Sequence, residues 1–229
     1  MADGAPPARR SLGQRAFYAL AKAVTLLALL VFFRLRRRGR AHAPRTGALL
    51  IVANHQSYLD PPMIGVTLAR QFHPLARAGL FESRWFGWLL RTVNSIPIRT
   101  EGNADTSAMR RALELLHAGA IVLIFPEGTR TQTGEVGAFE RGAGVLIKRA
   151  QCPVAPAAVE GAFEAWPRSR KWPRLFSKVG VVIGEPIPHD ELLREGVDAA
   201  LDRLRNEVVR LKSELQAERA GKARRGGSG

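Results

Sequence analysis

The chain has 229 residues, of which 46% are hydrophobic and 24% are charged, values close to the average for globular proteins. This length suits one domain with a substantial core plus one appendage, and the composition rules out both wholesale disorder and a polytopic membrane protein. The formal net charge is +15, and residues 1–45 contribute +9 of it through ten basic side chains against one acidic one, Asp3. The positive charge is therefore concentrated at the N-terminus.

An apolar run covers residues 16–33, with Lys22 as its one charged residue. Its length lies near the lower limit for crossing roughly 30 Å of hydrocarbon. The apolar side chains favour insertion into a membrane, and the lysine opposes it by a similar amount. The run therefore predicts contact with a membrane, either as a short span or as a helix that lies at the interface with its basic residues on anionic headgroups.

A dense basic block follows this run: Arg34, Arg36, Arg37, Arg38 and Arg40. Positive charge beside an apolar run is typical of a membrane anchor, whereas nucleic-acid-binding proteins usually spread their basic residues over a surface of the fold. We therefore expect no nucleic-acid partner. No small-residue cleavage site follows the run, so residues 1–45 are predicted to remain as an anchor, with residues 46 onward on the cytoplasmic face.

Beyond Pro44, short apolar runs alternate with amphipathic stretches, the pattern of an α/β domain. Helices are expected from Pro61 to Leu68, from Asp105 or Thr106 to His117, and over residues 142–150. The candidate strands are residues 48–53, 72–78, 93–98, 120–125, 154–159 and 179–183. The sequence thus predicts one catalytic domain over residues 46–189.

The C-terminal part carries one apolar stripe with alternating spacings of four and three residues: Val197, Leu201, Leu204, Val208, Leu211 and Leu215. Such a helix packs either on the sheet of its own chain or on a second chain in a coiled coil, and fewer than three full heptads favour the first. We expect an amphipathic helix over residues 190–220, packed on the domain. The remaining residues, 221–229, are rich in Gly, Arg and Lys and are expected to be a disordered tail.

The first strand of the domain runs directly into Asn54-His-Gln-Ser-Tyr-Leu-Asp60. Reactive groups in α/β folds lie at strand ends. A chain that leaves the strand at His55 and enters a helix near Asp60 can return the carboxylate to the imidazole, which orients one ring nitrogen and leaves the other as a base. Taken alone, a His and an Asp at this spacing more often form a structural pair.

A second strand end carries Phe125-Pro-Glu-Gly-Thr-Arg130. Arg130 offers two parallel donors to a phosphate, Gly128 allows a backbone to approach a ligand, and Glu127 can accept from a ligand hydroxyl or hold the arginine in place. A solvated Pro-Gly turn is the alternative for this hexapeptide by itself.

The two motifs, in this order and followed by residues 139–161 with Pro153 and Pro156, resemble the glycerolipid acyltransferase family of the H-x4-D type, the lysophosphatidate acyltransferases. The resemblance covers roughly residues 46–185. It implies one mixed sheet flanked by helices, with His55 as general base and Asp60 as the carboxylate that orients it. It also implies that the binding site of the acceptor includes Glu127, Gly128, Thr129 and Arg130.

The second block of the family's signature differs here. Residues 94–100 read NSIPIRT, so that Arg99 lies one position before the family's usual arginine. Because side chains alternate in direction along a strand, this shift bears on whether Arg99 reaches the phosphate. Arg77 lies where the family often has a lysine, and it is either a second phosphate contact or a surface charge.

The resemblance implies an O-acyltransferase that moves a fatty acyl group from an acyl thioester to a lysophospholipid, most directly 1-acyl-sn-glycerol-3-phosphate, giving phosphatidate. No G-x-S-x-G motif occurs, so the attacking hydroxyl is expected from the substrate rather than from a serine. No cofactor or metal is expected, and acyl carrier protein or coenzyme A carries the acyl group as co-substrate. Alternatives are glycerol 3-phosphate, another lysophospholipid or an amino-acid lyso-lipid as acceptor, or a module that binds anionic lipid without catalysis.

One further segment mixes aromatic and basic residues: Trp166, Arg168, Arg170, Lys171, Trp172, Arg174, Phe176 and Lys178. This mixture suits a lipid interface or an acidic carrier protein, and single-stranded nucleic acid is the alternative ligand.

Overall fold

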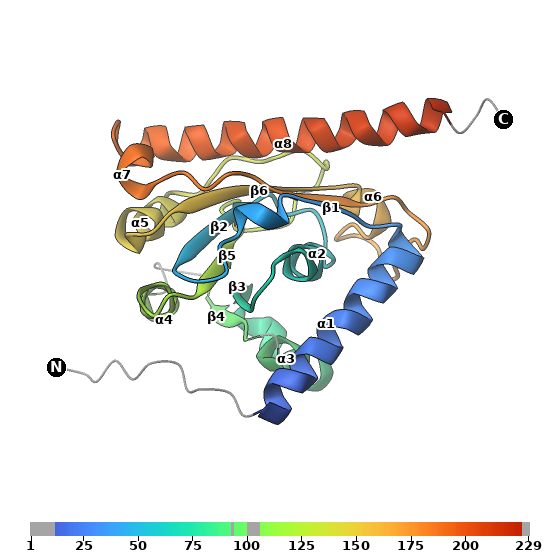
Figure 1. Cartoon of the computed structure of the whole chain (residues 1–229), viewed down its shortest axis with the longest axis horizontal. Coiled ribbons are helices and arrows are strands. Elements are labelled where there is room, and N and C mark those ends of the chain that lie inside the picture. Colours follow the sequence, from blue (N-terminus) through green and yellow to red (C-terminus); the bar gives the residue numbers. More distant parts are fainter. Residues whose placement is uncertain (1–11, 93, 100–105, 226–229) are drawn as a thin grey trace.

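The computed structural model describes residues 12–92, 94–99 and 106–225 (Figure 1). Within these residues one seven-stranded sheet has the order β1-β7-β6-β2-β5-β3-β4. Neighbouring strands are parallel except β6 and β7, so the expected mixed sheet is confirmed. The strands are β1 (Arg36–Arg38), β2 (Leu49–Ala53), β3 (Phe72–Arg77), β4 (Ile96–Ile98), β5 (Ile121–Ile124), β6 (Val154–Glu160) and β7 (Gly180–Ile183).

Helices cover both faces of the sheet (Figure 1). Helix α2 begins at Asp60 with two prolines in its first turn, and α4 begins at Thr106, both as the sequence predicts. The helices are α1 (Leu12–Phe33), η1 (Arg40–His42), α2 (Asp60–Thr67), η2 (Ala78–Phe81), α3 (Arg84–Thr92), α4 (Thr106–His117), α5 (Arg141–Ala150), α6 (Ala162–Ala165), α7 (His189–Leu192) and α8 (Val197–Arg225).

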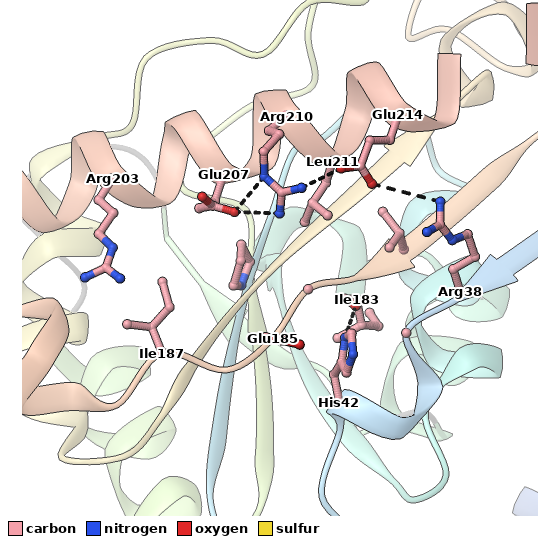
Figure 2. Close-up of a pocket in the computed structure, with 14 residues that line it drawn as sticks. Arg38, His42, Ile183, Glu185, Ile187, Arg203, Glu207, Arg210, Leu211 and Glu214 are labelled. Atoms are coloured by element: carbon pink, nitrogen blue, oxygen red, sulfur yellow. Dashed lines mark hydrogen bonds and ion pairs between the residues drawn. The ribbon is translucent and has the colours of Figure 1, made fainter. Parts of the chain in front are cut away.

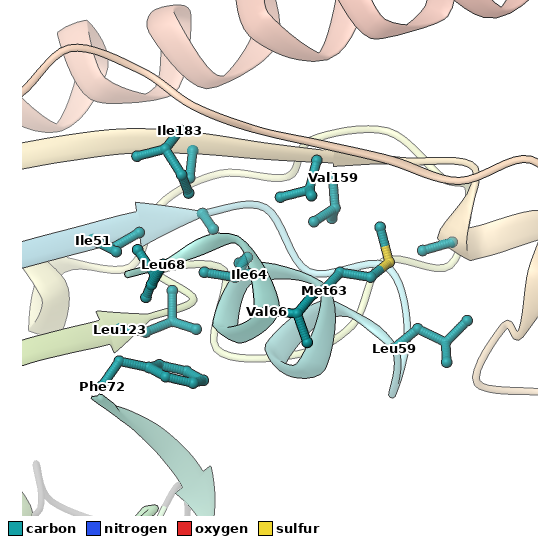
Figure 3. Close-up of a cluster of buried hydrophobic side chains, with 14 of the residues drawn as sticks. Ile51, Leu59, Met63, Ile64, Val66, Leu68, Phe72, Leu123, Val159 and Ile183 are labelled. Carbon is teal, nitrogen blue, oxygen red and sulfur yellow. The ribbon is translucent and has the colours of Figure 1, made fainter. Parts of the chain in front are cut away.

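The central strands are buried on both faces, which explains why their sequences are continuously apolar rather than alternating. On one face, Ile51 and Leu123 pack with Ile64 of α2 (Figure 3). On the other face, Leu50 packs in a cluster with Leu116 of α4 and with residues of α5 and α8. The two layers fix the ends of β2 and β5, where both sequence motifs begin.

The apolar stripe of α8 packs on the chain's own sheet. Val208, Leu211 and Leu215 cluster with Ala158 of β6 and Val182 of β7, and Figure 1 shows α8 lying along β6. The preferred interpretation of the stripe is therefore confirmed. The helix continues to Arg225, so the expectation of disorder from residue 221 is wrong for residues 221–225, and residues 226–229 lie outside the described part of the chain.

Strand β1 was not predicted from the sequence. Its three arginines show no apolar alternation, and the strand exists because its backbone pairs in parallel with β7, with Arg36 opposite Gly180. Arg37 donates to the carbonyl oxygen of Val66 at 2.8 Å, and Arg38 pairs with Glu218. The sheet therefore begins before residue 46, and part of the basic block belongs to the fold rather than to the anchor.

Two other segments differ from expectation. Helix α3 was not predicted, and the expected strand over residues 93–98 is reduced to β4, with Val93 outside the described residues. Asp105, one of the two proposed starts of the helix that became α4, also lies outside them. Both differences lie at the sheet edge, where short elements carry little periodic signal.

Helix α1 packs against α2 along one side and exposes apolar side chains on the other. Leu29 and Phe33 are buried, whereas Leu20, Val24 and Leu27 are 63%, 59% and 62% exposed. Residues 16–33 have a mean hydropathy of 2.2 and only 11% of them are buried, so α1 is long and apolar enough to cross a membrane by length and composition. Its one charged residue within that run, Lys22, donates to the carbonyl oxygen of Leu68 at the end of α2.

Candidate active site

The site begins where two neighbouring parallel strands end. β2 pairs with β5, so the loop with His55 and the loop with Glu127 leave the sheet side by side. The His55 ring stacks on Phe125 with ring centroids 4.0 Å apart and an interplanar angle of 16°. The Thr131 amide donates to the carbonyl oxygen of His55 at 2.8 Å. The two motifs, 70 residues apart in the sequence, therefore form one structural unit.

His55 and Asp60 are in contact, as their spacing predicts. Nδ1 of His55 lies 2.8 Å from Oδ2 of Asp60, and the same oxygen accepts the backbone amides of Gln56 at 2.6 Å and Ser57 at 2.7 Å. Asp60 is fully buried in the first turn of α2, while the His55 side chain is 20% exposed. The two backbone amides hold the Asp60 carboxylate in place against the imidazole. This arrangement fixes the imidazole and leaves Nε2 to face a ligand.

Glu127 lies behind the loop that carries His55. Its Oε1 accepts the His55 amide at 2.9 Å, and its Oε2 accepts the Gly137 amide at 3.0 Å. Burial raises the pKa of the Glu127 carboxyl, and the two amides oppose that shift. A Cβ on Gly137 would lie 3.0 Å from Oε2 of Glu127, so a larger residue there would crowd this carboxylate. Both oxygens of Glu127 are thus held by backbone amides rather than by Arg130, and the expected contact with a ligand hydroxyl stays a prediction.

A cavity of about 260 Å³ opens beside His55. One part of its lining is apolar and the other part is basic. Such a division suits a molecule with an apolar chain and an anionic head. The residues that line it are His55, Tyr58, Pro61, Leu75, Ala76, Arg77, Leu80, Leu90, Ile98, Ile124, Phe125, Gly128, Thr129, Arg130 and Arg168.

Arg130 is held by stacking rather than by an acid. Its guanidinium carbon lies 3.7 Å from the centroid of the Tyr58 ring. Its Nη1 is buried and has no hydrogen-bond partner among the residues that the structure describes. A buried donor without an acceptor is costly, and an anionic ligand in the cavity would supply the acceptor. The geometry therefore matches the phosphate contact that the sequence assigns to Arg130.

The two other arginines predicted for the site, Arg77 and Arg99, differ in whether they line the cavity. Arg77 lines the cavity, and its Nη2 donates to the Gly128 carbonyl at 3.3 Å. Gly128 has φ 66°, a left-handed conformation that favours glycine. Ile98 lines the cavity but Arg99, the exposed next residue, does not. This agrees with the alternation of side-chain directions along a strand, and residue 100, where the family has its arginine, lies outside the described residues.

Besides apolar lining residues, sequence reasoning missed two polar residues of the cavity, Tyr58 and Arg168. Tyr58 lies inside the first motif, but its contact with Arg130 joins two loops that are distant in the sequence. The sequence places Arg168 in the aromatic and basic segment, for which it predicts a surface role. In the structure Arg168 is exposed and also lines the cavity, where its Nη1 donates to Oγ1 of Thr129 at 3.4 Å.

The loop of the first motif is also held from β6. The Asn54 side chain exchanges two hydrogen bonds with the Val159 backbone, at 2.8 and 3.0 Å. The Gln56 amide group donates to the Gly134 carbonyl at 3.0 Å and lies 3.5 Å from Glu160. These contacts fix the loop that carries His55 relative to the sheet.

Glu160 links this loop to α8. Its Oε1 accepts from Arg219 at 2.6 Å, and Lys212 lies 4.0 Å away. Burial raises the pKa of the Glu160 carboxyl, while Arg219 opposes that shift. The C-terminal helix therefore braces the same loop that orients the imidazole.

A second hollow lies between α8 and the end of β7, with a volume of about 390 Å³ (Figure 2). Its arginines already have carboxylate partners: Arg210 pairs with Glu207 and Glu214, and Arg38 also pairs with Glu214. This groove therefore lacks the uncompensated positive charge of the cavity beside His55. Among the residues that the structure describes, no group of three or more His, Cys, Asp or Glu side chains is placed to hold a metal ion.

Sequence comparisons match this chain to known acyltransferases. The sequence model described as Acyltransferase matches residues 34–160. A 1-acyl-sn-glycerol-3-phosphate acyltransferase of Bacillus subtilis is 29% identical over 181 residues, which are 77% of this chain and 87% of that protein. The chloroplastic enzyme LPAT1 of Arabidopsis thaliana is 28% identical over 170 residues, 73% of this chain but 48% of that protein. The chain thus spans about half the length of this plant relative.

The fold is also that of a solved structure. The crystal structure of the 1-acyl-sn-glycerophosphate (LPA) acyltransferase PlsC from Thermotoga maritima superposes with a TM-score of 0.76 at 24% sequence identity. The match covers 92% of this chain and 85% of that one. It includes the mixed sheet and the flanking helices described above.

Proposed function

The chain belongs to the acyltransferase family, and from that premise we propose that it moves a fatty acyl group from an acyl thioester to the free hydroxyl of 1-acyl-sn-glycerol-3-phosphate, giving phosphatidate. The observation that carries this proposal is the joint position of His55, held by Asp60, and of Arg130 on one cavity. The names of the relatives support the choice of acceptor.

In the proposed reaction, Nε2 of neutral His55 takes the proton of the acceptor hydroxyl as the oxygen attacks the carbonyl carbon of the thioester. The new C–O bond forms, the C–S bond breaks as the tetrahedral intermediate collapses, and the proton passes from the imidazolium to the leaving thiolate. Asp60 stabilises the imidazolium and holds its ring. The acyl thioester is the one co-substrate that this reaction requires, and no cofactor takes part.

The remaining residues of the two motifs have separate proposed roles. Arg130 and Arg77 bind the phosphate of the acceptor, and the left-handed turn at Gly128 lets the ligand approach the backbone. Thr129 lies on the cavity wall. Glu127 acts indirectly, because it fixes the backbone of His55 rather than touching the acceptor.

We propose that α1 lies along the membrane surface, with the rest of the chain on the cytoplasmic face. Lys22, in the middle of the apolar run, is bonded to Leu68 of the catalytic domain. If α1 crossed the bilayer, it would draw the end of α2 and the neighbouring Arg70 into hydrocarbon, where a charged group is expensive. A surface position leaves the exposed Val24 and Leu27 to the lipid.

The acyl donor is a thioester of acyl carrier protein or coenzyme A, and one experiment tests donor and acceptor together. Purified protein is incubated with each labelled donor and with lysophosphatidate, glycerol 3-phosphate, lysophosphatidylcholine or an amino-acid lyso-lipid. We expect phosphatidate from lysophosphatidate, with one thiol released per ester formed. Thiol release with a different acceptor alone would contradict the proposed substrate, and lipid binding without thiol release would indicate a non-catalytic module.

A further inference from the structure

Arg168 reaches the cavity from a part of the chain that neither motif includes. It lies between α6 and β7, beyond a turn in which the Trp166 carbonyl accepts from the Ser57 hydroxyl at 2.8 Å. The Trp166 and Tyr58 rings lie 5.4 Å apart. The segment that carries Arg168 is therefore fastened to the loop of His55, and the position of this guanidinium is tied to that of the proposed base.

The charge of the cavity is unbalanced. Three guanidinium groups line it, from Arg77, Arg130 and Arg168, and none of the described lining residues is acidic. The groove of Figure 2, in contrast, neutralises its arginines with glutamates. Like charges gathered without a counter-charge repel one another, so the cavity is suited to an anion that contacts more than one of them.

The bond between Arg168 and Thr129 is one that a ligand can replace. It is 3.4 Å long and joins a charged donor to a neutral hydroxyl, which makes it weak by the usual geometry. A phosphate oxygen offers the same donor a shorter, charge-assisted bond. Arg168 can thus exchange its bond to Thr129 for one to a phosphate whose oxygen accepts from the buried Nη1 of Arg130.

The number of cations also bears on the kind of phosphate. A phosphomonoester carries up to two charges on three terminal oxygens, whereas the phosphodiester of other lysophospholipids carries one charge on two such oxygens. Arg99 does not line the cavity, so Arg168 provides the third guanidinium. Three guanidinium groups match the three oxygens of a monoester.

We propose that Arg168 binds the phosphate of the acceptor and selects phosphomonoester over phosphodiester acceptors. This inference rests on the proposed function, because it assumes that the acceptor enters the cavity beside His55. Arg168 acts in binding and does not take part in proton transfer, so its removal changes affinity for the acceptor rather than the chemical step.

The test compares Arg168→Ala and Arg168→Lys with Arg170→Ala, a matched control from the same segment whose exposed side chain does not line the cavity. For Arg168→Ala we expect the apparent KM for lysophosphatidate to rise about tenfold, the lower end for a hydrogen bond between charged groups, with kcat and the donor KM changed by less than about twofold. Arg168→Lys retains the positive charge but lacks the paired donors of the guanidinium, so its apparent KM for lysophosphatidate should lie between those of the wild type and Arg168→Ala. Arg170→Ala should match the wild type.

The relative rate with lysophosphatidylcholine gives a second readout, because the preference for lysophosphatidate over it should fall in Arg168→Ala alone. An unchanged KM and preference in Arg168→Ala, or an equal change in Arg170→Ala, would overturn the role of Arg168. If the wild type itself consumes no thioester with lysophosphatidate, the proposed function fails. Calorimetric binding of lysophosphatidate then decides the inference separately: weaker binding by Arg168→Ala than by Arg170→Ala supports it, and equal binding overturns it.

Discussion

His55 is held at four points: its ring stacks on Phe125, its Nδ1 meets Asp60, its amide donates to Glu127 and its carbonyl accepts from Thr131. A base fixed in this way loses little entropy when the acceptor binds, and its free nitrogen keeps one direction. At the scale of single residues, therefore, the orientation of the imidazole depends on the groups that contact His55.

The shifted pKa of Glu127 leads to a prediction about stability. Burial raises this pKa, so the folded protein holds the proton more tightly than the unfolded chain. The stabilisation from that proton is complete below the unfolded pKa, about 4.3, and is lost as the pH rises through the raised folded pKa. Glu127→Gln does not titrate at this position. We expect the free energy of unfolding of the wild type, relative to Glu127→Gln, to fall as the pH rises above the unfolded pKa of about 4.3.

Urea titrations of both full-length proteins in the same detergent, at several pH values, measure this difference. The glutamine also presents an NH2 group to one of the two amides that Glu127 accepts, which lowers the stability of the variant by an amount independent of pH. The change of the difference with pH is therefore the informative quantity. A difference that increases with pH would mean that the amides of His55 and Gly137 outweigh burial.

At the scale of elements, α2 connects the proposed base with the membrane helix. Asp60 stands in its first turn, and its last turn presents the carbonyl of Val66 to Arg37, with that of Leu68 just beyond to Lys22. The basic side chains suit the negative end of the helix dipole. Helix α1 is thus fastened to the helix that orients His55.

The exposed face of α1 leads to a prediction about membrane binding. Val24→Glu with Leu27→Glu places two charges where we propose lipid contact, on side chains that are 59% and 62% exposed. We expect the doubly substituted protein to lose most of its binding to anionic vesicles in flotation assays, because each charge opposes burial in the interface. Substitution is preferable to deletion of residues 1–40, since that deletion would remove β1 from the sheet.

Val209→Glu is a matched control, because Val209 is a 37% exposed apolar residue on α8. This control should float with the vesicles like the wild type. Flotation of the doubly substituted α1 protein to the same extent would show that another surface binds the membrane.

At the scale of the whole molecule, the sequence predicts the elements that are marked by a continuous apolar run or by a helical apolar stripe. The buried strands β2, β5 and β6, the helix α4 and the stripe of α8 follow from their apolar patterns. Strand β1 could not be predicted, since three arginines form a strand only through pairing with β7. Helix α3 and the short β4 lie at the edge of the sheet, where fewer apolar positions mark an element.

The site was predicted in a similar way. The contact of His55 with Asp60 is local, and its spacing within one turn between a strand and a helix was enough to anticipate it. The contact of the His55 amide with Glu127 and that of Arg168 with Thr129 join loops distant in the sequence. Such contacts depend on the path of the chain between elements, for which the sequence carries no periodic signal. A one-residue shift likewise removed Arg99 from the cavity.

The most direct test of the account is the rate of phosphatidate formation by His55→Ala on vesicles that contain lysophosphatidate, with acyl thioester supplied in solution. Circular dichroism and vesicle flotation should show that the variant folds and binds membrane like the wild type. Because Nε2 of His55 is the proposed base, we predict that kcat falls by about 10²- to 10⁴-fold with little change in the acceptor KM. A folded, membrane-bound His55→Ala protein that makes phosphatidate at the wild-type rate would contradict the account.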